Sequence, residues 1–409
     1  MKTSIAQTMT TPFSLAISAI FASGLSSQVL ASSSFNDALT SGKPSVDINL
    51  RYESVNDAST PSKSATALTE RTRLGYLTGD YKGLSGFVEY SGVETLTPRS
   101  DYHVGAGVDA DTNTSKSVIA DPTLTRLNQA WIHYKLGNLD TKLGKQRIIM
   151  DARFLGNVGW RQTEQVYTGL RLTTKPSKAA KIDYAYLSES DNIFGIKTPM
   201  ATHALKLDYK LSPAIRLAGY GYLIDNDNST SDSATYGLRA KGAVPLSSIK
   251  LLYQAEYASQ GNYADSKGVS ASYTHLLVGM KLSGIVLAIA QEKLGGDGTY
   301  AFQTPLATKH AYNGWADKFL TTPATGLIDN YLKVATKVKG IKLAGFYHDF
   351  SADKGGANLG SELDLVAATK LAKIYKVGIK YAGYSKGSAT TGGTSYDTSK
   401  LWIWGGVKF

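Results

Sequence analysis

Apolar and polar residues alternate along most of the chain, and this pattern limits what the chain can fold into. In SVDINLRYESV (45–55), apolar side chains occupy one parity, and mostly charged or amide side chains occupy the other. The same period recurs in AKIDYAYLSES (180–190), HALKLDYKL (203–211), SIKLLYQAEYA (248–258) and YKVGIKYAGY (375–384). A period of two predicts strands with one apolar and one polar face. Such strands suit either a soluble sandwich or a barrel whose apolar face meets lipid.

The number of segments and the lengths of their connections favour the barrel. We mark about eighteen strand-like segments, which begin near residues 45, 68, 84, 127, 139, 165, 181, 203, 214, 234, 248, 271, 284, 331, 341, 362, 375 and 401. Tight links such as TGDYKG (78–83), LGN (136–138) and SPA (212–214) carry the Gly, Pro and Asn residues that turns require. Longer links alternate with them, at 92–126, 148–164, 188–202, 224–233, 259–270, 294–330, 350–361 and 385–400.

This alternation is how transmembrane barrels are connected, with short periplasmic turns and long extracellular loops. The predicted fold class is therefore all-β. We expect a transmembrane antiparallel β-barrel of about 18 strands, with 16 as the alternative count. The expected location is the outer membrane of a Gram-negative bacterium, where lipid and lipopolysaccharide surround the barrel.

The N-terminal segment carries an export signal. Residues 1–31, MKTSIAQTMTTPFSLAISAIFASGLSSQVLA, contain one charge, at Lys2, followed by an apolar stretch. Val29 and Ala31 are the small residues expected before a cleavage site. We therefore predict a signal peptide at 1–31 and a transmembrane porin barrel at 32–409.

The chain ends on Phe409, after LWIWGGVKF (401–409), in which apolar residues alternate. This ending resembles the C-terminal signature of bacterial outer-membrane proteins. The resemblance implies that the last strand pairs with the first, and that the barrel-assembly machinery recognises the strand that carries Phe409.

Motifs for catalysis and for metal or cofactor binding are missing from the sequence. The chain has no cysteine, its six histidines are scattered, and no HExxH, GxSxG or GxxxxGK segment occurs. A Ser–His–Asp set could still assemble across strands, with His133 as the best candidate base, although a polar lumen residue is the simpler interpretation. We predict a protein that is not an enzyme and that uses no metal and no cofactor.

Basic residues are frequent at the strand positions that are predicted to face inward. The chain has 44 Lys and Arg against 33 Asp and Glu. Inward positions include Arg51, Arg71, Arg73, Lys142, Arg171 and Arg239, while acidic residues there are fewer. Rings of Lys and Arg favour anion passage, unless they pair with facing acids and merely brace the wall. Trp131 adds a stacking surface suited to sugars, and basic residues inside a barrel offer no surface to nucleic acid.

Two stretches resemble a known family. KLGKQRIIMDARFLGNVGWRQTEQVYTGL (142–170) and GGDGTYAFQTPLATKHAYNGWADKFLTTPATGLIDNYL (295–332) are similar to segments of the alginate-export family of outer-membrane porins. The resemblance implies an 18-stranded monomeric channel with an arginine-rich lumen. It also implies that Arg73, Arg147 and Arg161 contact an anionic solute, and that Trp160 or Trp315 stacks on a sugar face.

Together these features predict an outer-membrane porin, a passive diffusion channel whose basic lumen passes small polar or anionic solutes such as carboxylates and saccharides. The alternative is a dedicated exporter of an acidic polysaccharide such as alginate. A third possibility is an adhesive or structural barrel, whose bore would be filled by side chains or plugged by the 294–330 loop.

Overall fold

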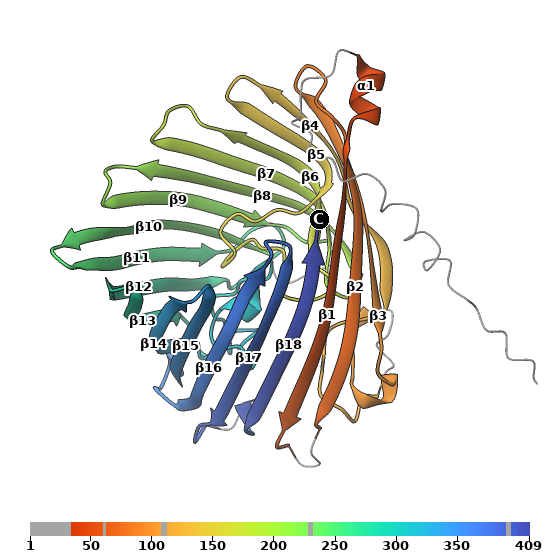
Figure 1. The fold of residues 1–409 in the computed structure, drawn as a ribbon. Coiled ribbons are helices and arrows are strands. Elements are labelled where there is room, and N and C mark those ends of the chain that lie inside the picture. The colour runs from red at the N-terminus through yellow and green to blue at the C-terminus, as the bar shows by residue number, and fades with distance from the viewer. Residues whose placement is uncertain (1–33, 60–62, 108–112, 228–231, 390–393) are drawn as a thin grey trace, which may run out of the picture.

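The computed structural model describes residues 34–59, 63–107, 113–227, 232–389 and 394–409. These residues form one closed ring of 18 antiparallel strands, in which each strand pairs with its neighbours in the chain and β1 also pairs with β18 (Figure 1). The strands are β1 (Lys43–Asp57), β2 (Ala65–Leu77), β3 (Leu84–Thr95), β4 (Leu124–Leu136), β5 (Leu139–Gln146), β6 (Val166–Thr174), β7 (Ala180–Asp191), β8 (Lys197–Lys210), β9 (Ile215–Ile224), β10 (Ser233–Leu246), β11 (Ile249–Gly261), β12 (Ser270–Leu282), β13 (Ile285–Leu294), β14 (Leu327–Val338), β15 (Ile341–Ser351), β16 (Asn358–Leu371), β17 (Tyr375–Lys386) and β18 (Thr398–Lys408).

The predicted 18-stranded barrel is confirmed, and the alternative of 16 strands is wrong. Short turns and longer loops alternate as expected, with one exception. The segment 188–202, predicted as a long loop, mostly continues β7 and β8, and only residues 192–196 connect these two strands. The predicted signal peptide and its cleavage site at 1–31 lie outside the described residues.

Helices are short and few in the described ranges. They are α1 (Phe35–Thr40), which lies beside the turn at 78–83, and the 3₁₀ segments η3 (Arg99–Asp101) and η5 (Lys309–Ala311). Within those ranges, no helix is both long enough and apolar enough to cross a membrane.

The barrel closes at the last residues of the chain. The Val46 amide donates to the Phe409 carbonyl at 2.9 Å, and the Phe409 amide donates back to the Val46 carbonyl at 3.0 Å. The ladder between β1 and β18 then continues from Asp47 opposite Lys408 to Asp57 opposite Thr398. This closure leaves no open sheet edge among the 18 described strands, as a sheet surrounded by lipid requires.

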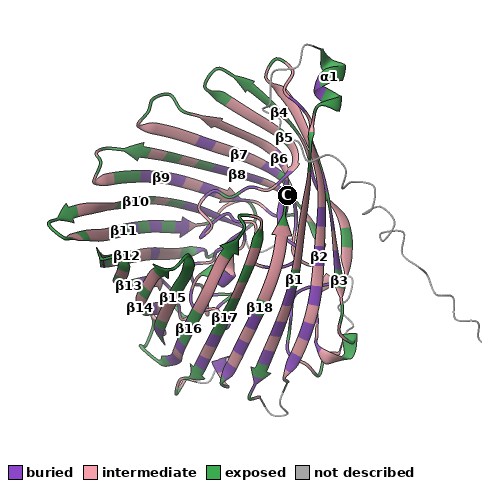
Figure 2. Cartoon of the chain, viewed as in Figure 1, coloured by how far each residue is buried: buried purple, intermediate pink, exposed green. Residues whose placement is uncertain are grey.

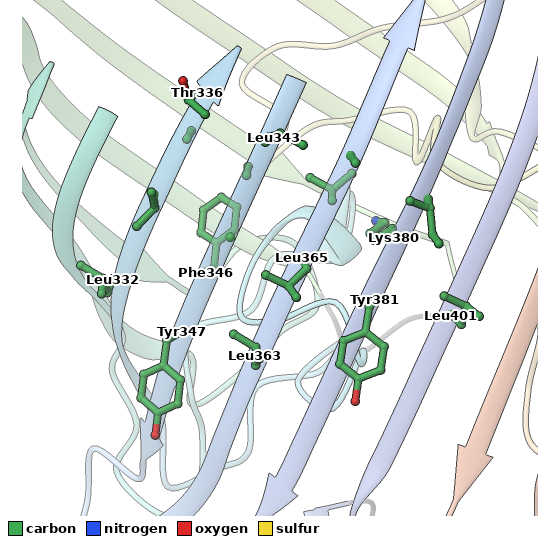
Figure 3. A pocket seen from close by; sticks show the side chains of 17 residues that line it. Leu332, Thr336, Leu343, Phe346, Tyr347, Leu363, Leu365, Lys380, Tyr381 and Leu401 are labelled. Carbon is green, nitrogen blue, oxygen red and sulfur yellow. The ribbon is translucent and has the colours of Figure 1, made fainter. Parts of the chain in front are cut away.

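Large apolar side chains cover the outside of the ring. Leu238, Ile289 and Leu143 are 72%, 63% and 58% exposed, which suits contact with lipid. On the outer face of β14 to β18, side chains such as Leu332, Tyr347, Leu363, Leu365 and Tyr381 line a shallow apolar groove of about 660 Å³ (Figure 3). Its apolar lining suits contact with lipid acyl chains.

The lumen differs between its two ends. On β1, the inward residues Arg51 and Glu53 near the loops are buried, while Asp47 and Asn49 nearer the turns are partly exposed. The strand β11 shows the same change, with Glu256 and Gln260 buried and Lys250 exposed. Figure 2 shows buried segments and exposed ends along the same strands, β9 and β11 among them. Because loops fold into the barrel from one end, its loop-side half is packed and its turn-side half is open.

Candidate functional site in the lumen

Two long connections enter the barrel and cross its interior. We call residues 147–165, between β5 and β6, the first inner loop, and residues 295–326, between β13 and β14, the second inner loop (Figure 1). The first contacts walls far apart in sequence, because Arg161 pairs with Glu53 of β1 at 2.8 Å and the carbonyl of Met150 accepts from Tyr222 of β9 at 2.6 Å. The apolar core of the protein therefore lies inside the lumen, between these loops and the wall.

The inner loops are bonded to each other. The Gly156 amide donates to the Leu306 carbonyl at 2.9 Å, and the Thr308 amide donates to the Ala152 carbonyl at 2.8 Å. Gly156 is required at this crossing, since a Cβ there would lie 2.2 Å from the Thr308 hydroxyl oxygen and 2.9 Å from the Thr308 amide nitrogen. The two loops thus form one inner unit rather than two independent flaps.

Buried ion pairs attach this unit to β1 and to a third connection. Arg51 of β1 binds Asp121, which lies between β3 and β4, and also donates to the carbonyl of Trp160. Arg161 lies within 3.8 Å of Asp121 and 3.6 Å of Asp317. Burial opposes ionisation of Asp121, but the guanidinium groups of Arg51 and Arg161 and the amide of Gln162 hold its pKa below the usual value. Asp121 is therefore a buried carboxylate that fixes two arginines.

A second buried carboxylate, Glu164, fixes two more arginines. It binds Arg147 through both carboxylate oxygens, and Arg73 of β2 lies 3.4 Å away. Asn128 of β4 donates to it at 2.7 Å. Burial favours the neutral acid, yet Arg73, Arg147 and Asn128 lower the pKa of Glu164 to about 2. The Arg147 side chain remains 33% exposed, so this ion pair reaches the lumen surface.

Aromatic rings surround a lysine of the wall where the two inner loops meet it. The ammonium nitrogen of Lys380, on β17, lies 3.5 Å from the ring centroid of Trp160 and 4.4 Å from that of Trp315. The same nitrogen is 2.7 Å from Nε2 of His310, and the His310 ring stacks on Trp160 with an 8° angle between planes. Trp402 of β18 closes the cluster edge-on, at 5.8 Å from Trp160.

The loop side holds a cavity of about 730 Å³, lined in part by both inner loops, which we call the loop-side vestibule. Among the charged residues that line it, basic ones outnumber acids. Burial lowers the pKa of Lys318 to about 8, so its charge changes close to neutral pH. The lining includes Lys63, Lys116, Lys309, Lys318 and Lys400, with Asp57 and Asp317 as the acids.

The open turn-side half carries cations opposite one another across the strands. Lys250 faces Lys281, Lys337 faces Lys342, and Lys370 faces Lys376. Like charges in directly opposed positions destabilise a sheet, so this arrangement costs stability. We call the whole set the turn-side basic belt, comprising Lys142, Arg171, Lys210, Arg216, Lys241, Lys250, Lys281, Lys337, Lys342, Lys370 and Lys376.

All seven arginines predicted from the sequence lie inside the barrel and are paired with carboxylates. Arg71 binds Asp47 at 2.5 Å, Arg239 binds Asp151 at 2.5 Å, and Arg171 donates twice to Asp183, at 2.8 and 2.6 Å. The pairs of Arg51, Arg73, Arg147 and Arg161 are those described above. Bracing of the wall, which the sequence left open, therefore accounts for much of the arginine content.

The predicted lysine and tryptophans divide between two regions. Lys142 has no carboxylate within 4.0 Å of its ammonium nitrogen among the described residues, and that nitrogen lies 3.9 Å from the ring centroid of Trp131. Trp160 and Trp315 belong to the Lys380 cluster, where their rings contact Lys380 rather than open lumen. A sugar-stacking role for these tryptophans stays a prediction.

His133 does lie in a Ser–His–Asp arrangement. Its Nδ1 is 3.4 Å from the Ser85 hydroxyl oxygen, and its Nε2 is 3.0 Å from Oδ1 of Asp140. Acyl transfer also needs donors placed for an oxyanion, so this contact alone does not make a catalytic site. Among the described residues, no group of three or more His, Cys, Asp or Glu side chains is arranged to hold a metal ion.

Sequence reasoning missed the acids that organise the site. These acids lie on connections between strands, where the period of two does not predict which way a side chain points. They are Asp121, Glu164 and Asp317. The inward parity of Trp402 and Trp404 was visible in the sequence, but their contact with Trp160 was not.

Comparisons with known proteins identify the fold. Three similar solved structures are Acinetobacter baumannii OccAB2 (16% identity, TM-score 0.71, covering 91% of this chain and 99% of that chain), Acinetobacter baumannii OccAB1 (12%, 0.70, 91% and 97%) and Pseudomonas aeruginosa OpdK with vanillate (11%, 0.69, 91% and 100%). No protein-family model and no curated protein matches the chain.

The architecture is that of 18-stranded outer-membrane porins, and such a barrel belongs in the bacterial outer membrane. The resemblance to the alginate-export family finds no support in these comparisons, because the similar structures are Occ and Opd porins.

Proposed function

We propose that the protein is a passive diffusion channel that favours small anionic solutes. The observation that carries this proposal is the turn-side basic belt. Its like-charged pairs cost sheet stability, and a wall that keeps them concentrates anions in the pore. The Occ and Opd channels have the same fold, and one of them was solved with vanillate, a small carboxylate.

The packed loop-side half bears on the size of the solute. The inner loops contact each other and β1, β9 and β17, so in the described part of the chain they cross the lumen that a polymer would have to thread. Small carboxylates and saccharides suit this geometry better than an acidic polysaccharide does. We therefore do not favour a dedicated polysaccharide exporter, or membership of the alginate-export family.

We further propose that the channel has no bond chemistry. The lumen supplies charge and hydrogen bonds, and selection follows from them and from the shape of the inner unit. The exposed ring of Phe409 and its strand remain our proposed contact with the barrel-assembly machinery, and lipid and lipopolysaccharide our proposed surroundings.

The test is single-channel recording from the refolded protein in planar bilayers, with the reversal potential measured under a KCl gradient. We expect a steady chloride-selective current. Changing Lys210, Arg216 and Lys241 together to Gln should lower the chloride preference. The control changes Lys82, Lys339 and Lys373, which lie in turns rather than on the wall, to Gln. A folded, heat-modifiable barrel without conductance would instead favour the adhesive or structural alternative.

A further inference from the structure

We propose that a pocket in the turn-side wall is a binding subsite for a sugar acid, such as a hexuronate, with Trp131 under the ring and Lys142 on the carboxylate. The inference rests on the proposed function, because it places a solute subsite in the channel path. The pocket has a volume of about 440 Å³ and is lined by inward residues of β2 to β6, among them Ser85, Trp131, His133, Asp140, Lys142 and Arg171.

Trp131 provides a fixed ring. It lies on β4, its indole nitrogen donates to Gln129 at 3.4 Å, and Phe87 of the neighbouring strand lies 5.3 Å away between ring centroids. The Lys142 ammonium nitrogen lies 3.9 Å from the ring centroid. An aromatic ring held this way on a rigid strand is a stacking surface for the apolar face of a sugar.

Lys142 provides the charge. Arg171, directly opposite it across β5 and β6, is engaged by both oxygens of Asp183. Lys142 has no carboxylate within 4.0 Å among the described residues. An anion placed on Lys142 also relieves its repulsion with Arg171. Binding thus exchanges the contact between Lys142 and Trp131 for a carboxylate on the lysine and a sugar face on the indole.

Hydrogen-bonding groups at the rim select the class of acid. Ser85, His133 and Asp140 form one chain of contacts, and the Asp140 side chain is 47% exposed. Sugar hydroxyls supply donors and acceptors for these groups. An apolar aromatic acid would cover them without replacing their bonds to water, which a polar site penalises. The pocket therefore suits a hydroxylated ring that bears one carboxylate.

The subsite is separate from the buried network around Asp121 and Glu164. Those acids hold the inner unit in the loop-side half, while the pocket opens between β2 and β6 near the turns. A solute can occupy it without displacing an inner loop.

The experiment is a titration of D-galacturonate into the full-length folded barrel in detergent micelles, followed by ligand NMR, with current blockade in bilayers as a second readout. We expect Lys142→Met and Trp131→Leu each to weaken binding about tenfold, the value of one charge-assisted or stacking contact. Lys250→Met is the matched control, because it removes one charge from the basic belt outside the pocket. D-Galactose and benzoate should both bind more weakly than D-galacturonate.

Each outcome decides the question. If Lys250→Met weakens galacturonate binding as much as Lys142→Met does, the binding comes from the charge of the whole basic belt and the subsite is wrong. If benzoate binds as tightly as galacturonate, the site does not select sugar acids. If the channel is chloride-selective but the parent protein does not bind galacturonate, the subsite is wrong and the proposed function still stands. Binding with the expected variant pattern in a barrel that does not conduct would do the reverse.

Discussion

The ammonium nitrogen of Lys380 lies 3.5 Å from the ring centroid of Trp160, which joins the barrel wall to the first inner loop. The same lysine contacts Trp315 of the second inner loop and His310. One side chain of β17 therefore contacts both inner loops.

Replacing Lys380 with Met should loosen the inner unit. A desolvated cation–π contact contributes about 2 kcal/mol, and methionine keeps the length of the side chain without the charge. We expect larger open-channel current noise and more frequent conductance steps in bilayer recordings. Lys376→Met, on the same strand and the same inward parity, removes a charge from the open half. Equal noise in both variants would contradict the role of Lys380.

Replacing Glu164 with Gln should raise the chloride preference of the channel. Arg73 and Arg147 would lose a carboxylate whose pKa of about 2 keeps it charged at neutral pH. Their charge would then act on solutes instead. The reversal potential under a KCl gradient measures this change. Glu189→Gln removes a carboxylate that pairs with the exposed Lys197, and it should shift the potential less.

The charge of the loop-side vestibule should depend on pH. Burial lowers the pKa of Lys318 to about 8, so its ammonium group is charged below that pH and neutral above it. Chloride preference should therefore fall as the pH rises from about 7 to about 9. Lys318→Arg keeps the charge over this range, since the guanidinium stays protonated. A drop of the same size in the arginine variant would assign the effect to another group.

A methyl group at position 156 should disturb the crossing of the inner loops. The added carbon of Gly156→Ala would overlap the Thr308 hydroxyl and its backbone amide, and such overpacking costs about 1–3 kcal/mol. We expect a lower temperature of heat modification on gels and an altered unitary conductance. Gly405→Ala is the control, because no atom lies within 4 Å of the position of its Cβ. If Gly156→Ala changes neither the temperature of heat modification nor the conductance, the close approach of Gly156 to Thr308 is not needed to hold the two loops together.

The strands were predictable because apolar and polar side chains alternate every two residues along a wall with one face in lipid. This pattern can be read from each short segment by itself. Most predicted starts lie within a few residues of the observed ones, but β8 begins at Lys197 rather than near 203. Pro199 in KTPMAT reads as a loop signal, yet it pairs with Glu189 beyond an irregularity in β7.

The site was less predictable than the wall. Parity assigns Arg73 and Arg171 to the lumen, but it cannot tell a paired arginine from a free one. That distinction depends on Glu164 and Asp183, and Glu164 lies on a connection whose path through the lumen is set by contacts with β2 and β4. The inward turn of the loops follows from such long-range contacts, for which no local pattern exists.

The pairing of Val46 with Phe409 also determines when the barrel can close during assembly. Every other pairing in the ring joins two strands that are consecutive in the chain, so each closes a shorter loop than this one does. This one joins the first strand to the last, so it must wait for the whole chain, and until then β1 and β18 expose unpaired amides and carbonyls that attract other strands. Assembly of this protein is therefore most vulnerable at its final step, and any factor that shields those two edges would govern how much of it reaches the membrane intact.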